Sequence, residues 1–264
     1  MTTVHTLASG SSGNAAVISW PGGHLLADAG ISCRRILEGL KSLELRPRDL
    51  SGILITHTHG DHVAGLQRLL KWTDCPVWAT ARTGRDLLAE MTGLEPRLRE
   101  AVPGQRMDGG TYALTAVPTS HDAPGACGFR LELGEASVGL LTDTGFVTPE
   151  AEALLSGVSL AVLEANHDVE TLRRGPYPYA LKRRILGPAG HLSNDAAAAF
   201  AVALAEAGTE SIVLAHLSAR NNTPAMAWRA VRDALAEAGQ NPLLAVAAPD
   251  RISGPFDAGA AVRR

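Results

Sequence analysis

The sequence predicts an α/β fold in which two β-sheets pack face to face between outer helices, an αββα sandwich. Apolar strand patterns alternate with helix patterns along the chain, and this alternation occurs in two halves. Of the 264 residues, 45% are apolar but only 4% are aromatic, so the core must consist mainly of Ala, Val and Leu. No fixed-period repeat or low-complexity linker separates the halves, and we therefore expect one domain, 1–264.

The first half is expected to begin with strands and tight turns. Small residues form a loop at Ser9–Asn14, and Pro21-Gly22-Gly23 supplies the turn of a hairpin. After a polar turn, Val63, Leu66, Leu69 and Leu70 lie on one face of an amphipathic helix. The remaining predicted elements are strands at Val4–Leu7, Ala15–Trp20, His24–Ala27 and Gly52–Ile55, and helices at Ser32–Leu43 and Arg82–Met91.

The second half is expected to start with short strands and Gly-rich turns, from about Thr111 to Leu141. A basic stretch follows at Thr171–Arg184. Gly208 is placed to end one helix, and Thr223-Pro224 is a favourable N-cap and first-turn pair for the next. The other predicted elements are strands at Leu160–Leu163, Ile212–Ala215 and Leu243–Ala247, and helices at Asp195–Ala207 and 224–238.

Composition excludes several classes of protein. The net charge of −3 is not that of a globally basic nucleic-acid binder, so any such partner must be held by a local patch. The three cysteines, Cys33, Cys75 and Cys127, include no closely spaced pair, which argues against a disulfide framework or a cysteine zinc site. Because we find neither a signal-peptide pattern nor about 18 continuous apolar residues, we expect a soluble cytoplasmic protein without membrane association.

Four potential metal ligands lie within six residues, His57-Thr58-His59-Gly60-Asp61-His62, directly after a buried strand. Burying each of them without a partner would cost about 2–7 kcal/mol, so they are not expected to pack as core. His57 and His59 are two positions apart, and an extended backbone directs both to one side. Asp61 and His62 begin a helix and can face a second ion. Imidazole and carboxylate ligands suit Zn²⁺ or Mn²⁺.

Six residues do not complete two coordination spheres, so further ligands must lie later in the chain. His121, Asp143 and His216 each follow an apolar strand, where the site residues of layered α/β folds collect. Each of them alone could be a capping or core polar residue. Together with the histidine-rich turn they become candidate ligands.

The order HxHxDH, then His, Asp and His, resembles the metallo-β-lactamase superfamily along almost the whole chain. The resemblance implies two metal ions per chain. It also implies that Asp28 supports the histidine-rich turn instead of binding metal. In the implied ligand set, one ion is held by His57, His59 and His121, the other by Asp61, His62 and His216, and Asp143 bridges them.

Shorter motifs are similar to those of the YycJ/WalJ group of this superfamily, which is associated with DNA 5′-exonuclease activity. These motifs are Ser9–Asn14, Glu164–Asp168, Gly190–Asn194, His216–Ser218 and Asn221–Pro224.

Glu164 and His191 also resemble the Glu and His that tRNase Z enzymes place beside their metals, which implies that these two residues are catalytic. Asp61 is expected to be catalytic as well as a metal ligand. Hydrolysis of a phosphodiester needs an activated hydroxide, charge neutralisation at phosphorus and a proton for the departing alkoxide. Histidine is suited to supply that proton near neutral pH, with a carboxylate to orient it. The alternatives are an ordinary turn residue for His191 and a buried, hydrogen-bonded carboxylate for Glu164.

Substrate contacts are expected from the basic stretch and from the small-residue loop. Arg173–Tyr179 and Lys182–Arg184 interleave cations, which can contact phosphates, with tyrosines, which can stack on bases. Ser9–Asn14 could offer hydroxyl and N–H groups to a terminal phosphate. A solvated helix face and a tight turn are the respective alternatives. The expected contact residues are Ser11, Ser12, Asn14, His167, Arg173, Arg174, Tyr177, Tyr179, Asn194, Ser218 and Asn222.

These features favour a two-metal phosphodiesterase acting on nucleic acid, and the resemblance implies a DNA 5′→3′ exonuclease with Mn²⁺ or Zn²⁺ as cofactor. A tRNase Z-like endoribonuclease is one alternative, although we see no long Gly/Pro-rich arm to grip tRNA. A small-molecule (thio)ester or lactone hydrolase is another, because one fold and metal set support many chemistries. The sequence leaves the choice between DNA and RNA, the metal and the oligomeric state, including a homodimer, open.

Overall fold

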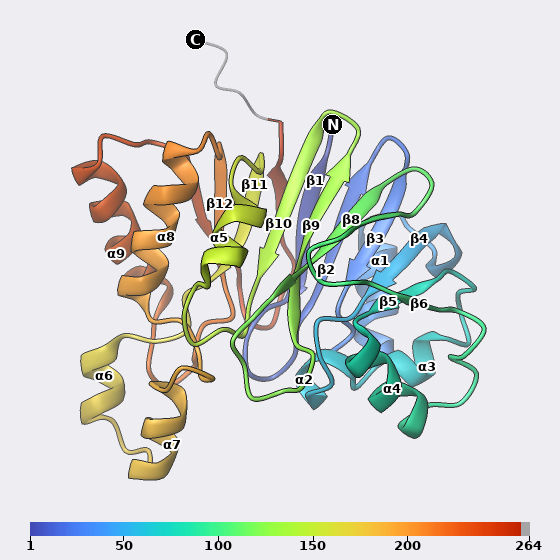
Figure 1. Cartoon of the computed structure of the whole chain (residues 1–264), viewed down its shortest axis with the longest axis horizontal. Helices are drawn as coiled ribbons and strands as arrows, with labels where there is room; N and C mark the ends of the chain where they lie inside the picture. Colours follow the sequence, from blue (N-terminus) through green and yellow to red (C-terminus); the bar gives the residue numbers. More distant parts are fainter. Residues whose placement is uncertain (260–264) are drawn as a thin grey trace.

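The computed structural model describes residues 1–259 and has the predicted four layers: two mixed sheets face each other between outer helices (Figure 1). Each sheet has seven strands within the described range. The αββα prediction is therefore confirmed. Residues 260–264, the end of the predicted domain, lie outside the described part of the chain.

The first sheet combines the N-terminal strands with one strand from the end of the described chain. From β3 to β6 neighbouring strands are parallel, and the other pairs are antiparallel. Its order is β14 (Ser253–Asp257), β1 (Thr3–Ala8), β2 (Ala15–Trp20), β3 (Gly23–Ala27), β4 (Leu50–Leu54), β5 (Val77–Ala79) and β6 (Leu98–Glu100).

The second sheet repeats this arrangement with the later strands. The pairs from β10 to β13 are parallel, and those from β7 to β10 are antiparallel. Its order is β13 (Leu243–Val246), β12 (Ser211–Ala215), β11 (Leu160–Glu164), β10 (Ala136–Leu141), β9 (Cys127–Leu133), β8 (Ala113–Pro118) and β7 (Arg106–Asp108).

Three layers of apolar side chains hold the four layers of backbone together. Between the sheets, Ile18 and Leu54 of the first sheet pack with Phe129 and Val162 of the second. The outer two layers lie between each sheet and its helices. The helices of the first half are α1 (Cys33–Ser42), α2 (Gly60–Val63), α3 (Leu66–Leu69) and α4 (Ala81–Glu90), and those of the second are α5 (Pro149–Leu155), α6 (Val169–Arg174), α7 (Tyr179–Ile185), α8 (Asn194–Glu206) and α9 (Pro224–Glu237).

Two of these helices do not cover a sheet. Figure 1 shows α8 and α9 along the outer face of β11 and β12, whereas α6 and α7, in yellow, project as a separate lobe. This lobe is the predicted basic stretch, and Gly175–Pro178 divides it into two short helices. We call residues 169–185 the α6–α7 lobe.

The predicted helix after the histidine-rich turn is wrong in its length, because it is broken into α2 and α3 at Gly65. The N–H of Gly65 donates to the carbonyl of Ala29 at 2.8 Å, and the carbonyl of Asp61 accepts from Asn14 N at 2.8 Å. In a continuous helix the N–H of Gly65 would donate to the carbonyl of Asp61, but both groups are hydrogen-bonded to earlier loops. Sequence patterns also gave no indication of β5, β6, β14 and α5, which are short or lie at sheet edges.

Candidate metal centre and cleft

The predicted ligands meet at the edge of the sandwich where parallel strands end. Asp28 follows β3 directly, His216 follows β12 directly, and Asp143 lies two positions beyond β10. All three have left-handed backbone conformations, with φ of 57°, 56° and 58°. Such a conformation costs an L-residue about 1–2 kcal/mol, and it persists where the surrounding structure enforces it, commonly at functional sites.

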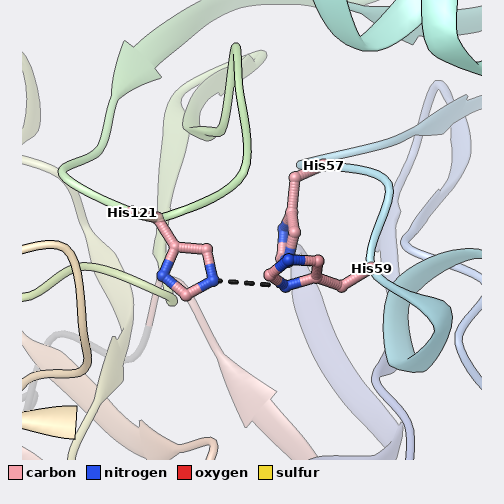
Figure 2. A group of neighbouring side chains, drawn as sticks. All are labelled: His57, His59 and His121. Atoms are coloured by element: carbon pink, nitrogen blue, oxygen red, sulfur yellow. Dashed lines mark hydrogen bonds between the residues drawn. The ribbon is translucent and has the colours of Figure 1, made fainter. Parts of the chain in front are cut away.

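His57, His59 and His121 form the first group of candidate ligands (Figure 2). The Nδ1 of His59 lies 3.4 Å from the Nε2 of His121. The far ring nitrogens have protein partners: His57 Nδ1 lies 3.0 Å from Thr56 Oγ1, and His121 Nδ1 lies 3.1 Å from the carbonyl oxygen of Gly190. These contacts fix the rings and leave one nitrogen of each for a common ligand.

Asp61, His62 and His216 form the second group. One carboxylate oxygen of Asp61 lies 3.6 Å from His62 Nε2 and 3.7 Å from His216 Nε2. Asp143 lies between the two groups, since its Oδ2 is 3.2 Å from His62 Nε2 and its Oδ1 is 3.7 Å from His121 Nε2.

The chemistry of this cluster fits divalent metal ions. The Nε2 atoms of His57 and His216 and the Oδ2 of Asp143 are buried, and none of them has a hydrogen-bond partner among the described residues. Native proteins rarely bury such atoms without a partner. All three point into a cluster of nitrogen and carboxylate oxygen ligands, the set that Zn²⁺ and Mn²⁺ accept.

Burial and neighbouring charges set the protonation of the histidines. Burial lowers the pKa of His57 to about 2, and the neighbouring His62 adds to this effect. Burial also disfavours the charged form of His62, but the charges of Asp28 and Asp143 outweigh it and raise its pKa to about 10. Asp28 accepts from Thr56 N at 2.9 Å and lies 2.8 Å from His62 Nδ1. It therefore supports the histidine-rich turn, as expected.

The histidine-rich turn is fixed by backbone contacts with two earlier loops. A side chain at Gly30 would collide with the carbonyl oxygen of Asp61, so only glycine allows these loops to approach. Asn14 ties the small-residue loop to the same place: its Oδ1 accepts from Gly10 N at 2.9 Å, and its Nδ2 lies 3.0 Å from His62 Nε2. Asn14, which we expected to contact substrate, is thus buried and holds the turn.

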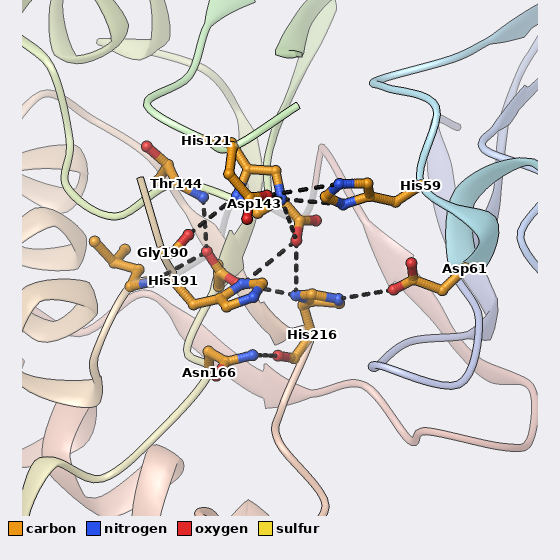
Figure 3. Close-up of polar contacts among 12 residues, drawn as sticks. His59, Asp61, His121, Asp143, Thr144, Asn166, Gly190, His191 and His216 are labelled. Atoms are coloured by element: carbon orange, nitrogen blue, oxygen red, sulfur yellow. Dashed lines mark hydrogen bonds and ion pairs between the residues drawn. The ribbon is translucent and has the colours of Figure 1, made fainter. Parts of the chain in front are cut away.

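Glu164 lies behind the metal-ligand cluster and is completely buried. Its Oε1 lies 2.8 Å from His191 Nδ1 and 2.9 Å from His216 Nδ1. Its Oε2 accepts from the backbone N–H groups of Thr144 and Leu192 at 3.0 and 3.2 Å. Figure 3 shows His191 and His216 side by side, with Asp143 above them.

This network sets the charges of Glu164 and His191. Burial would raise the pKa of Glu164, but the charges and hydrogen bonds of His191 and His216 lower it to about 2. Burial disfavours a charged His191, yet the carboxylate of Glu164 raises its pKa. The pair therefore favours an imidazolium beside a carboxylate. No described residue binds the Nε2 of His191.

A cleft of about 190 Å³ opens beside the cluster, and His191 and His121 form part of its wall. Arg184 reaches this cleft from α7, and its Nε donates to Asp122 Oδ2 at 2.6 Å. From the sequence we expected Arg184 to contact phosphate only as part of the basic stretch, and we did not predict a role for Asp122, which directly follows a predicted ligand. The cleft is lined by Ser11, His121, Asp122, Asn166, Tyr177, Leu181, Arg184, Ile185, Ala189, Gly190, His191 and Ser218.

Three of the expected substrate contacts lie on this cleft: Ser11, Tyr177 and Ser218. Ser12 is exposed in the same loop as Ser11. Other expected contacts lie on the outside of the α6–α7 lobe, where Arg173 and Arg174 form ion pairs with Glu170 and Tyr179 is 76% exposed.

The remaining expected contacts are buried among other side chains of the protein. Asn194 and Asn222 are buried, and each side-chain amide donates to the other's oxygen, at 3.0 and 2.8 Å. This reciprocal pair joins the start of α8 to the turn before α9 and leaves little of either amide for a ligand. His167 is 1% exposed, so it is neither a surface histidine nor accessible to a polymer.

With this fold and ligand set, the chain belongs to the beta-lactamase superfamily, whose family model, "Beta-lactamase superfamily domain", matches residues 24–217. Two similar proteins are bacterial nucleases. The chain is 37% identical over 236 residues to exodeoxyribonuclease YycJ of Bacillus anthracis, covering 88% of this chain and 89% of that protein. It is 35% identical over 237 residues to exodeoxyribonuclease WalJ of Streptococcus pneumoniae, covering 88% of this chain and 87% of that protein.

Solved structures confirm the fold. The metallo-beta-lactamase fold protein YhfI of Bacillus subtilis superposes with a TM-score of 0.71 at 14% identity, covering 96% of this chain and 99% of that one. The short form of human tRNase Z gives a TM-score of 0.66 at 19% identity, covering 97% and 100%. No helix in residues 1–259 is long and apolar enough to cross a membrane.

Proposed function

We propose that this protein is a metal-dependent nuclease that hydrolyses DNA from the 5′ end, with two divalent ions per chain. The observation that carries the proposal is the position of His191: one ring nitrogen is held by the buried Glu164, and the ring lines a cleft beside the metal-ligand cluster. The names of the two relatives, both exodeoxyribonucleases, support DNA as the substrate.

Two groups of candidate ligands that share Asp143 support the stoichiometry of two ions. We propose Mn²⁺ or Zn²⁺, held on one side by His57, His59 and His121 and on the other by Asp61, His62 and His216. When bound, the ions would activate water and offset charge on the phosphoryl group. Five carboxylates surround the site and would repel the negative charge of a phosphodiester, so the bound metal ions are needed for the substrate to approach. These carboxylates are Asp28, Asp61, Asp122, Asp143 and Glu164.

His191 is proposed to give a proton to the departing oxygen of DNA. With Nδ1 held by Glu164, the atom that can carry this proton is Nε2. Glu164 keeps the imidazole oriented and stabilises its positive charge. The same carboxylate holds His216, so proton donation and metal binding share one support.

We propose that Ser11, Ser12, Tyr177 and Ser218 contact the substrate at or near the cleft. Arg173, Arg174 and Tyr179, outside the cleft, are proposed to contact the strand further from the reacting phosphate. A cytoplasmic location would fit both a DNA substrate and three unpaired cysteines, which are typical of a reducing compartment.

The first experiment uses end-labelled single- and double-stranded DNA and RNA with Mn²⁺ or Zn²⁺. We expect mononucleotides or short products from the 5′ end of DNA. Internal cleavage of RNA would favour a tRNase Z-like endoribonuclease. Failure to cleave either polymer, with hydrolysis of thioesters or lactones, would favour the small-molecule hydrolase.

The second experiment compares His191→Ala with the wild type on two substrates. DNA turnover should fall by about 10²–10⁴-fold, the usual contribution of an acid–base group. Bis(p-nitrophenyl) phosphate should be much less affected, because nitrophenolate leaves without a proton. His24→Ala, in the β2–β3 hairpin, is the matched control. An equal loss on both substrates, with loss of metal, would make His191 a ligand or a structural support.

A further inference from the structure

One cation of the basic stretch, Arg184, lines the cleft beside the metal-ligand cluster, while its neighbour Arg183 faces another hollow. Arg184 lines the cleft together with His121 and His191. Arg183 lies over the ring of Tyr179, at 5.9 Å from its centroid, and lines a separate hollow with Arg173. Two adjacent arginines with the same charge thus have different surroundings.

Arg184 is held in place by one hydrogen bond, and its other N–H groups have no partner among the described residues. Its Nε donates to Asp122, and this is its one side-chain hydrogen bond to the described residues. A guanidinium has five N–H donors, and the side chain of Arg184 is 58% exposed, so the terminal N–H groups remain available. The other oxygen of Asp122 lies 3.4 Å from His121 Nε2, which places this ion pair at the rim of the metal site.

The backbone fixes Arg184 relative to His191. The N–H of His191 donates to the carbonyl of Ile185 at 3.1 Å, and a side chain at Gly190 would collide with the carbonyl oxygens of Arg184 and Ile185. Ser120 clamps the same loop by donating to the carbonyl of Pro188 at 2.8 Å. The end of α7 and the proposed proton donor therefore form one unit.

We propose that Arg184, together with Tyr177 and Ser11, which line the same cleft, forms a phosphate-binding subsite next to the metal site. This inference rests on the proposed nuclease function. A guanidinium fork matches the geometry of phosphate oxygens, and hydroxyl groups can add neutral hydrogen bonds. Asp122 acts as a positioning residue, because it restrains Arg184 before the phosphate arrives.

The phosphate has two sources in nucleic acid: the 5′-terminal group or an internal phosphate next to the scissile one. The test measures binding of metal-loaded protein to fluorescent oligonucleotides that carry either a 5′-phosphate or a 5′-hydroxyl and whose linkages are phosphorothioates, which resist hydrolysis. Arg184→Ala, Arg184→Gln and Arg183→Ala are compared with the wild type. The α7 helix loses the same charge in all three variants.

We expect Arg184→Ala and Arg184→Gln to weaken binding of the 5′-phosphate oligonucleotide by about 10- to 100-fold, the usual contribution of hydrogen bonds to a charged group. Arg183→Ala should weaken binding of both oligonucleotides equally and by a smaller factor, because it only removes one positive charge from the surface. A large loss confined to the 5′-phosphate identifies the terminal group, and a large loss with both ends identifies an internal phosphate. Either result supports the subsite.

The subsite is overturned if both Arg184 variants bind both oligonucleotides as Arg183→Ala does, with normal metal content. Cleavage of unmodified DNA by the wild type, measured in parallel, tests the nuclease function separately. An inactive wild type that still shows the Arg184-specific loss would contradict the nuclease function and keep the subsite.

Discussion

Replacing Glu164 by Gln perturbs the residue that supports both the proposed proton donor and a proposed metal ligand. The carboxylate accepts hydrogen bonds on both oxygens, from His191 and His216 on one and from two backbone N–H groups on the other. A carboxamide has one acceptor oxygen and one NH₂ group. With His191 and His216 protonated at Nδ1, as pairing with the Glu164 carboxylate requires, the NH₂ group of Gln faces two donors whichever way it is turned.

The expected loss of stability follows from the number of hydrogen bonds that Gln cannot accept. Two hydrogen bonds to a charged acceptor disappear, each contributing about 1.5–3 kcal/mol. Glu164 is 0% exposed, so water cannot replace them without opening the structure. Breaking a buried charge pair typically costs about 3–5 kcal/mol, and we expect the free energy of unfolding of the metal-free protein to fall by that amount. At about 2–4 °C per kcal/mol, Tm should fall by roughly 6–20 °C.

The measurement is urea and thermal unfolding of metal-free wild type and Glu164→Gln. The matched control is Glu132→Gln, whose exposed carboxylate pairs with Arg106 at 2.7 Å and should contribute less than about 1 kcal/mol. Because Glu164 also holds His216, metal affinity should fall as well. A Glu164→Gln protein that unfolds like the control and keeps its metal affinity would refute the four-donor network.

Three further predictions concern the metal and the thiols. Asp143→Ala should lower metal content below two ions per chain in elemental analysis, because one carboxylate faces both ligand groups; unchanged content would rule out bridging. Asp28→Ala should weaken metal binding by about 10- to 100-fold in chelator competition, since it removes the support of His62, and the exposed Asp74→Ala should not. Burial raises the pKa of Cys75 and Cys127, so mass spectrometry should find both unalkylated at pH 8 until the protein unfolds; rapid labelling of the native protein would show that they are accessible.

The sequence predicted those parts of the site that depend on local spacing. Alternation of two positions placed His57 and His59 together, and apolar strands ending at Asp143 and His216 indicated ligands at the sheet edge. Strand and helix periodicities predicted most elements of both halves, because amphipathic patterns reflect which face is buried. The three-residue strands β5 and β6 carry too few residues for such a pattern, and the edge strand β14 contains Gly254 and Pro255, which interrupt it.

Local sequence patterns did not predict which polar residues are buried. Asn194 and Asn222 have the chemistry of substrate contacts, yet they bind each other across 28 positions of sequence. His167 gave no sign in the sequence that it would be buried. A polar side chain can satisfy its hydrogen bonds with any partner, so its sequence neighbours do not identify that partner.

The sequence by itself determined the fold class and the candidate metal ligands, because strand ends and ligand spacing are properties of short segments. The pairing of Glu164 with His191 was a hypothesis that the resemblance to tRNase Z enzymes implied. Only the tertiary structure decided which cations face the cleft. Arg183 and Arg184 are adjacent and identical in charge, but α7 turns them to different sides, and Arg184 meets Asp122 from 62 positions away. Contacts between distant segments depend on how sheets, loops and the α6–α7 lobe pack together, and no local pattern encodes that packing.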